Sequence, residues 1–67
     1  MALAKVIEVI AEGDSIEGAV EEAINQASKT LRSIKSINLE NIQAIVEDNS
    51  VTKYRINAKV TFVKDDG

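Results

Sequence analysis

The sequence predicts an α+β fold in which one helix packs on a three-stranded antiparallel-type sheet of strand order 1-3-2. Three observations predict it: an N-terminal segment rich in β-branched residues, one long helical stripe, and two alternating segments joined by a polar turn. The element order is therefore β-α-β-β, with the first and second strands flanking the last. The 67 residues contain no linker or internal repeat, so we expect one domain over 1–67.

The first strand is predicted at about residues 3–11. This segment, LAKVIEVIA, is rich in Val and Ile, and apolar side chains occur in both alternation sets. Leu3, Ile7 and Val9 belong to one set, and Val6 and Ile10 belong to the other. Such a strand needs cover on both faces, and Glu12-Gly13 is expected to end it.

The helix is predicted at about residues 15–32, where apolar residues recur at steps of three and four. The stripe consists of Ile16, Ala19, Val20, Ala23, Ile24, Ala27, Leu31 and Ile34. Two starts are open: Asp14 and Glu17 have the spacing of a capping box, and Ser15 could be the cap itself. Lys29 and Arg32 would then occupy the last turn, where positive charge complements the helix dipole.

Two further strands are predicted at about 35–47 and 51–64, joined by the turn Asp48-Asn49-Ser50. The last strand alternates between an apolar set and a polar set. The apolar set is Tyr54, Ile56, Ala58, Val60 and Phe62, and the polar set is Lys53, Arg55, Asn57, Lys59 and Thr61. Alternation in the preceding strand slips near Glu40-Asn41, which indicates a β-bulge. If Glu47 pairs with Val51, then Ala44 faces Tyr54, Gln43 faces Arg55 and Ser36 faces Thr61.

One helix covers only one face of such a sheet. Val6, Ile10, Ile45 and Val63 would remain open on the other face, and a partner subunit is the usual cover for such residues. A core in a chain this short rarely supplies more than about 3–5 kcal/mol without a disulfide, a metal or oligomerisation. The chain has no cysteine, so we expect self-association.

Composition excludes several functions. Without Cys and His, no thiolate nucleophile, Ser-His pair or zinc-thiolate site can be assembled, and we expect no enzymatic activity. The net charge of −3 disfavours binding to nucleic acid and to anionic membrane surfaces. The N-terminal residues lack the pattern of a signal peptide, which predicts a cytoplasmic protein.

The chain resembles the dodecin family in four stretches of sequence: Lys5-Val6-Ile7-Glu8-Val9 leading to Gly13; Ser15-Ile16-Glu17; Ala27-Ser28-Lys29-Thr30-Leu31-Arg32; and Tyr54-Arg55-Ile56 with Lys59-Val60-Thr61-Phe62. The resemblance covers almost the whole chain. It implies a hollow dodecamer of identical subunits that binds or stores riboflavin or FMN and does not catalyse a reaction.

The flavin site implied by the resemblance departs from the usual pattern at two positions. Ser36 stands where typical members have a tryptophan that stacks on the flavin, and Arg55 stands where they have a glutamine that hydrogen-bonds the ring edge. A serine contributes no stacking, and an arginine cannot accept a hydrogen bond from the ring N–H, so the sequence argues against the usual flavin geometry. We expect Ser36, Gln43 and Arg55 to line the corresponding pocket.

Three alternatives remain beside a flavin-type ligand at this pocket. Arg55 could instead form a salt bridge with Glu40, Glu8 or an acid of a neighbouring subunit, and this is the favoured interpretation of its charge. The replacement of both flavin residues also resembles a calcium-binding subgroup of the family. A calcium ion or another hard cation is thus an alternative ligand, with its binding residues unassigned, and a dodecamer without any ligand is a third.

Overall fold

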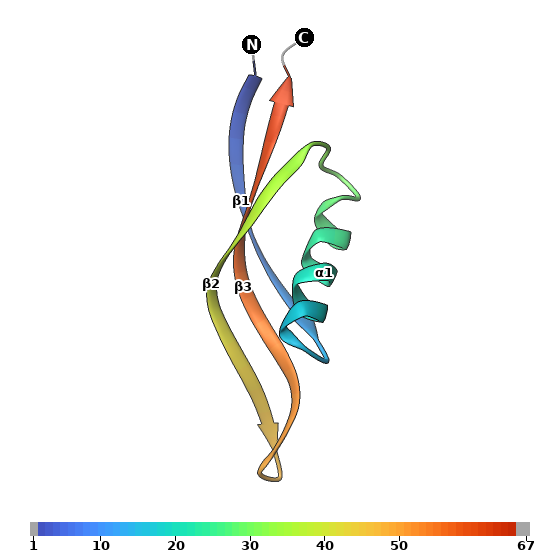
Figure 1. Ribbon diagram of the computed structural model, residues 1–67, viewed down its shortest axis with the longest axis vertical. Coiled ribbons are helices and arrows are strands. Elements are labelled where there is room, and N and C mark those ends of the chain that lie inside the picture. The colour runs from blue at the N-terminus through green and yellow to red at the C-terminus, as the bar shows by residue number, and fades with distance from the viewer. Residues whose placement is uncertain (1, 66–67) are drawn as a thin grey trace.

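A computed structural model, which describes residues 2–65, confirms the predicted fold class (Figure 1). The elements are β1 (Ala2–Gly13), α1 (Ile16–Ala27), β2 (Ile34–Glu47) and β3 (Ser50–Asp65). The strands form one antiparallel sheet in the order β1-β3-β2, and α1 lies on one of its faces. Residues 1, 66 and 67 of the expected domain lie outside the described residues.

Helix α1 is shorter than the sequence predicts. It ends at Ala27 instead of near residue 32, and the chain turns over the next residues before β2 begins. Ser28 Oγ donates to the backbone oxygen of Asn25 at 3.0 Å. Such side-chain hydrogen bonds compete with helical ones and favour an end of the helix at this point. Leu31 and Ile34 therefore lie beyond the helix, and Lys29 and Arg32 do not occupy its last turn.

The start of α1 decides between the two predicted caps. Ser15 is the N-cap, since its backbone is extended and its Oγ accepts a hydrogen bond from the Gly18 N–H at 2.8 Å. Just before it, Gly13 passes very close to the helix. A Cβ at position 13 would lie 2.5 Å from the backbone nitrogen of Ala19, so only glycine fits there.

The register of the hairpin agrees with the prediction over most of its length. Gln43 pairs with Arg55 and Ser36 with Thr61, and the register shifts between Leu39 and Asn41, at the predicted bulge. The predicted pairing of Glu47 with Val51 is wrong.

Glu47 pairs with Ser50, so the turn contains only Asp48 and Asn49, which have φ values of 51° and 63°. Positive φ at both turn residues gives the turn the right-handed twist that hairpins favour, and Asp and Asn tolerate it well. Another register shift, between Ile45 and Val46, compensates for the turn being one residue shorter than predicted. The pairing of Ala44 with Tyr54 is therefore the predicted one.

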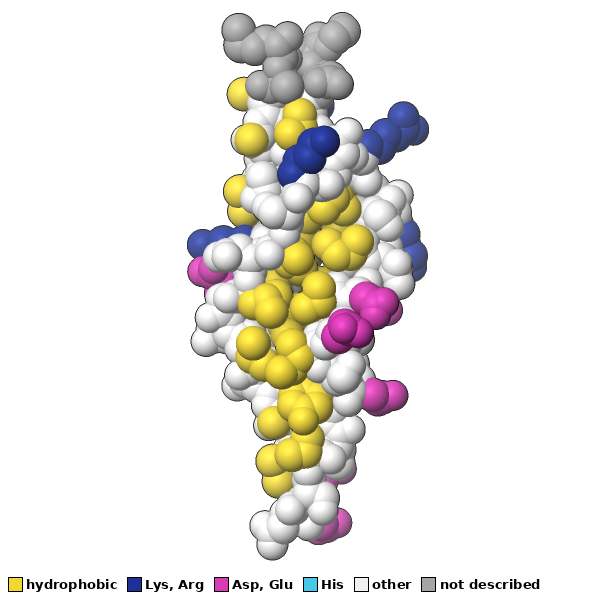
Figure 2. All heavy atoms as spheres, viewed as in Figure 1, with side chains coloured by type: hydrophobic (Ala, Val, Ile, Leu, Met, Phe, Trp, Pro, Cys, Tyr) yellow, Lys and Arg dark blue, Asp and Glu magenta, His cyan; other side chains and the backbone are white. Residues whose placement is uncertain are grey.

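The core lies between α1 and the middle of the sheet and is made mainly of small side chains. Its buried cluster consists of Ala11, Ala19, Ala23, Ile56 and Ala58. Alanine on both sides lets the helix approach the sheet closely, which also explains the tight contact at Gly13. Figure 2 shows that the apolar surface continues along the sheet past the end of the helix.

The subunit is elongated, measuring 53 × 19 × 13 Å. Its radius of gyration is 13.9 Å, whereas a compact domain of this length has about 11 Å. A twelve-residue helix spans only about 18 Å and leaves much of the sheet uncovered. β1 ends opposite Tyr54, and beyond it residues 45–53 form a two-stranded hairpin arm. Val46 in this arm is 57% exposed, as the prediction of a partner subunit requires.

Candidate functional site

The face of the sheet turned away from α1 is the outer face. Alternation along the three paired strands places its residues: Val6, Glu8, Ile10, Glu12, Ser36, Asn38, Asn41, Gln43, Ile45, Lys53, Arg55, Asn57, Lys59, Thr61 and Val63. Ile10, on the outer face, is 68% exposed. The open apolar surface predicted from the sequence is therefore present at Val6 and Ile10, whereas Ile45 and Val63 are half-buried within the subunit.

A depression of about 360 Å³ lies on the outer face, lined by Ile10, Asn41, Gln43, Arg55 and Asn57. It contains two of the three predicted site residues, Gln43 and Arg55, which are cross-strand neighbours. Ser36 lies elsewhere. It pairs with Thr61, six residues along β3 from Arg55, which corresponds to roughly 20 Å along a strand. One subunit thus brings Gln43 and Arg55 together, but not Ser36.

Sequence reasoning missed two polar members of this depression, Asn41 and Asn57. Asn57 is the more informative of the two. It was assigned only to the polar alternation set, but its Oδ1 is buried and has no hydrogen-bond partner among the described residues. Leaving a buried acceptor unpaired costs about 1–3 kcal/mol, so a donor from a ligand or another subunit is expected to complete it. The signal that could have found it is an amide on the central strand, where Asn57 pairs with Ile10 on one side and with Asn41 on the other.

Arg55 is held by an ion pair, as expected, but with a different carboxylate. Its Nε and Nη2 both lie 2.8 Å from Glu12 Oε2, and Lys53 Nζ lies 3.0 Å from Glu12 Oε1. Glu40, one of the expected partners, pairs with Lys59 at 3.7 Å instead. Glu12 was missed because the first strand was expected to end at Ala11. The strand continues to Gly13, which puts Glu12 directly opposite Arg55.

The two cations lower the pKa of the Glu12 carboxyl, chiefly through the hydrogen bond from Lys53 and then through that from Arg55. Glu12 is therefore ionised at neutral pH, and it fixes the Arg55 guanidinium at the rim of the depression. The side chains of Arg55 and Glu12 remain 43% and 36% exposed. The guanidinium is thus partly neutralised and still accessible to a ligand.

The chemistry of this depression is that of recognition by hydrogen bonds. Arg55 supplies only donors, whereas the amides of Gln43, Asn41 and Asn57 can donate and accept. Over the part of the chain that the structure describes, no three Asp or Glu residues gather in a way that could hold a metal ion. None of the described helices is long and apolar enough to cross a bilayer.

A sequence model of the dodecin family matches residues 3–65. Solved structures are similar over nearly the whole chain. The tt0972 protein from Thermus thermophilus has 22% identity and a TM-score of 0.90, with 100% of both chains covered. The dodecin from Streptomyces coelicolor has 25% identity and a TM-score of 0.89, covering 98% of this chain and 96% of that one. The dodecin from Streptomyces davaonensis has 20% identity and a TM-score of 0.88, covering 97% of each. A search of curated proteins found no match.

Proposed function

Because the chain belongs to the dodecin family, we propose that it binds or stores a small flat ligand of the flavin type, riboflavin or FMN, in a hollow dodecamer of its own subunits. The elongated subunit supports the assembly, since its hairpin arm and outer face both expose apolar side chains. We propose a binding role without catalysis. Glu12 stays ionised at neutral pH, which makes its carboxyl unsuited to act as a general acid.

The unpaired Oδ1 of Asn57 in the outer-face depression carries this proposal. The polar edge of a flavin ring presents an N–H between two carbonyl oxygens. Arg55 and Gln43 can donate to carbonyl oxygens, but Arg55 cannot accept from the N–H. Asn57 Oδ1 lies beneath the surface of the depression, and it can accept this N–H once the amide turns towards the ligand. Together these side chains supply both the donors and the acceptor that such an edge needs.

Stacking is the weaker half of the proposed site. Ile10 is the exposed apolar side chain at the depression, and it can pack on a ring face only by dispersion, without the quadrupole of an indole. Ser36 lies too far along the strand to contact a ligand beside Arg55 in the same subunit. It would reach the ligand only from another subunit. We therefore expect weaker flavin binding than at a site that contains tryptophan.

Fluorescence titration tests the proposal. Riboflavin and FMN are each titrated with the assembled protein, and we expect saturable quenching of flavin fluorescence. In Asn57→Ala the dissociation constant should rise about tenfold, because the acceptor for the ring N–H is lost. The same substitution removes an unpaired buried oxygen, so the melting temperature should not fall. Weaker binding in a protein that is no less stable distinguishes a ligand contact from misfolding.

Asn38→Ala is the matched control, since Asn38 lies on the outer face but does not line the depression. Native mass spectrometry of each variant reports the number of subunits and any retained flavin. Two results contradict the proposal: a wild-type protein that leaves flavin fluorescence unchanged, or an Asn57→Ala variant that binds flavin as tightly as the wild type.

A further inference from the structure

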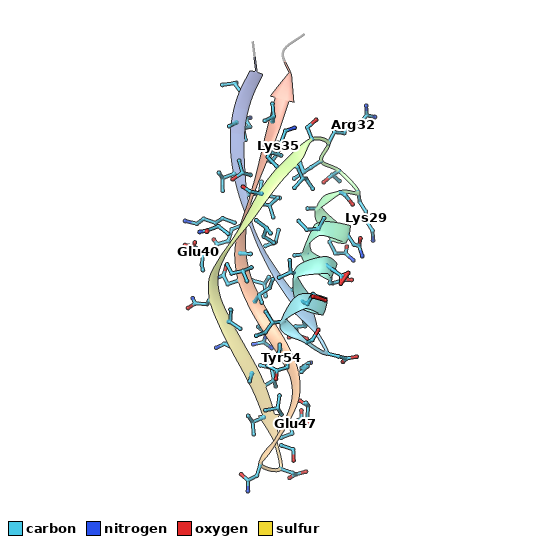
Figure 3. The ribbon with its side chains drawn as sticks, in the orientation of Figure 1. Lys29, Arg32, Lys35, Glu40, Glu47 and Tyr54 are labelled. Atoms are coloured by element: carbon cyan, nitrogen blue, oxygen red, sulfur yellow. The ribbon has the colours of Figure 1, made fainter. Side chains whose placement is uncertain are left out.

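The positive charge of the chain is divided between two places. Of the eight basic residues, the three on the outer face, Lys53, Arg55 and Lys59, each lie within 4.0 Å of a glutamate oxygen. Lys5, Lys29, Arg32, Lys35 and Lys64 are the other five. None of these five is ion-paired among the described side chains. Figure 3 shows Lys29, Arg32 and Lys35 around the loop between α1 and β2.

This loop borders a second and larger depression, of about 630 Å³, which we call the loop groove. Lys5, Arg32 and Lys64 contribute charge to its lining, and Ser33 contributes a hydroxyl. Leu31 and Phe62 contribute apolar surface and are half-buried. None of the described residues that line the groove is acidic, although the chain as a whole carries a net charge of −3.

Backbone contacts hold the groove in shape. Leu31 N–H donates to the Ala27 oxygen at 2.9 Å, and Val63 N–H donates to the Ser33 oxygen at 3.1 Å, which ties the loop to β3. Ser33 itself has a φ of 57°, in the left-handed region that serine seldom adopts. Lys5 pairs with Phe62 across the β1-β3 ladder, so charge and ring lie side by side. The groove is therefore preformed in the subunit.

We propose that the loop groove binds a small organic anion, a phosphate or carboxylate attached to an apolar or aromatic body. The anionic group lies among Lys5, Arg32 and Lys64, where arginine can hold two of its oxygens at once. The apolar body packs on Leu31 and Phe62. This site does not depend on the flavin proposal, because its lining residues are different from those of the outer-face depression.

Isothermal titration of the assembled full-length protein at low salt tests this proposal. The probes are phenyl phosphate, benzoate, inorganic phosphate and phenol. We expect phenyl phosphate to bind, inorganic phosphate to bind about tenfold more weakly because it lacks the ring, and phenol to give no heat. Benzoate decides whether a carboxylate is accepted as well as a phosphate. Raising the salt concentration should weaken the binding of either anion.

Arg32→Gln and Lys64→Gln should each raise the dissociation constant for phenyl phosphate about tenfold, since each removes a charged contact. Lys53→Gln, on the outer face, is the matched control and should leave it unchanged. Circular dichroism and native mass spectrometry identify any variant that has lost its fold or assembly. The proposal is overturned if phenyl phosphate does not bind to the wild type, or if both groove variants bind it unchanged. Asn57→Ala should keep phenyl phosphate binding, so failure of one proposal leaves the other standing.

Discussion

The middle of the sheet and the hairpin arm are parts of the same two strands, but they have opposite surroundings. In the middle, Ile56, Ala58 and Val60 are fully buried beneath α1 and beside the flanking strands. In the arm, Val46 and Val51 are 57% and 52% exposed, although both are as apolar as the buried residues. Figure 2 shows the apolar surface running from one region into the other.

This difference shows that burial within one subunit does not account for all of the apolar residues in the chain. The core cluster is largely alanine, so it buries little apolar surface per residue and depends on close approach of helix and sheet. The arm holds larger apolar side chains that gain nothing until another surface covers them. We interpret the middle as the part that fixes the fold and the arm as a part that stabilises the protein through assembly.

Gly13→Ala should produce the largest effect, because it breaks the covered region at its closest contact. The new Cβ would lie 2.5 Å from the Ala19 nitrogen and 2.7 Å from the Gly18 carbonyl carbon. Both are backbone atoms, which cannot move away as the end of a flexible side chain can. We expect a loss of about 2–3 kcal/mol in unfolding free energy, measured by chemical denaturation.

Gly18→Ala is the control for this substitution. Its new Cβ would meet only the Ser15 Oγ at 3.1 Å, and we expect a change of at most about 1 kcal/mol in either direction. Equal losses in the two variants would show that the close approach at Gly13 is not what limits the packing of α1.

Val46→Asp tests the arm and should have an intermediate effect. Covering a valine at an interface contributes about 1.5 kcal/mol or more, and an unpaired carboxylate there costs further. We expect smaller species in native mass spectrometry at concentrations where the wild type is fully assembled. Val46→Ile keeps the apolar character and should assemble normally. Full assembly of Val46→Asp would mean that no partner covers this part of the arm.

Glu12→Gln should have the smallest effect, since Glu12 is only half-buried and lies at the outer edge of the covered region. Its folded-state pKa is lowered below the ordinary 4.5, so the ion pair stabilises the protein above that pH and is lost as pH falls through the folded value. Melting temperatures from pH 7 to pH 3 should therefore separate wild type from variant at neutral pH and converge in acid. A constant separation down to pH 3 would contradict the assignment, and Glu21→Gln on the helix surface should behave like the wild type.

Much of the fold could be predicted because strand alternation is a strong signal. The polar and apolar sets of β3, together with the slip near Glu40, were enough to predict most of the hairpin register. The helix end could not be predicted in the same way. Leu31 and Ile34 continue the helical spacing by coincidence, and both are half-buried against other elements after the helix has ended. Spacing alone does not separate a helix from the loop that follows it.

The site was less predictable, because it depends on distances between strands. The prediction that Gln43 faces Arg55 followed from register. The pairing of Glu12 with Arg55 was not predicted, because Glu12-Gly13 was interpreted as the end of the strand. Glycine here marks a close contact with α1 and not a break in the strand. The unpaired state of Asn57 depends on its burial by neighbouring side chains, which no single-strand pattern contains.

The central strand of the sheet, β3, is also the last element in the chain, and this has a consequence for folding. The β2-β3 hairpin closes across a two-residue turn, whereas β1 pairs with β3 between residues as distant as Ala2 and Asp65. Closing so long a loop is slow compared with closing a hairpin. During synthesis β1 and α1 therefore have no sheet to join until β3 has emerged. We therefore expect β1 to join the sheet only after the β2-β3 hairpin has formed.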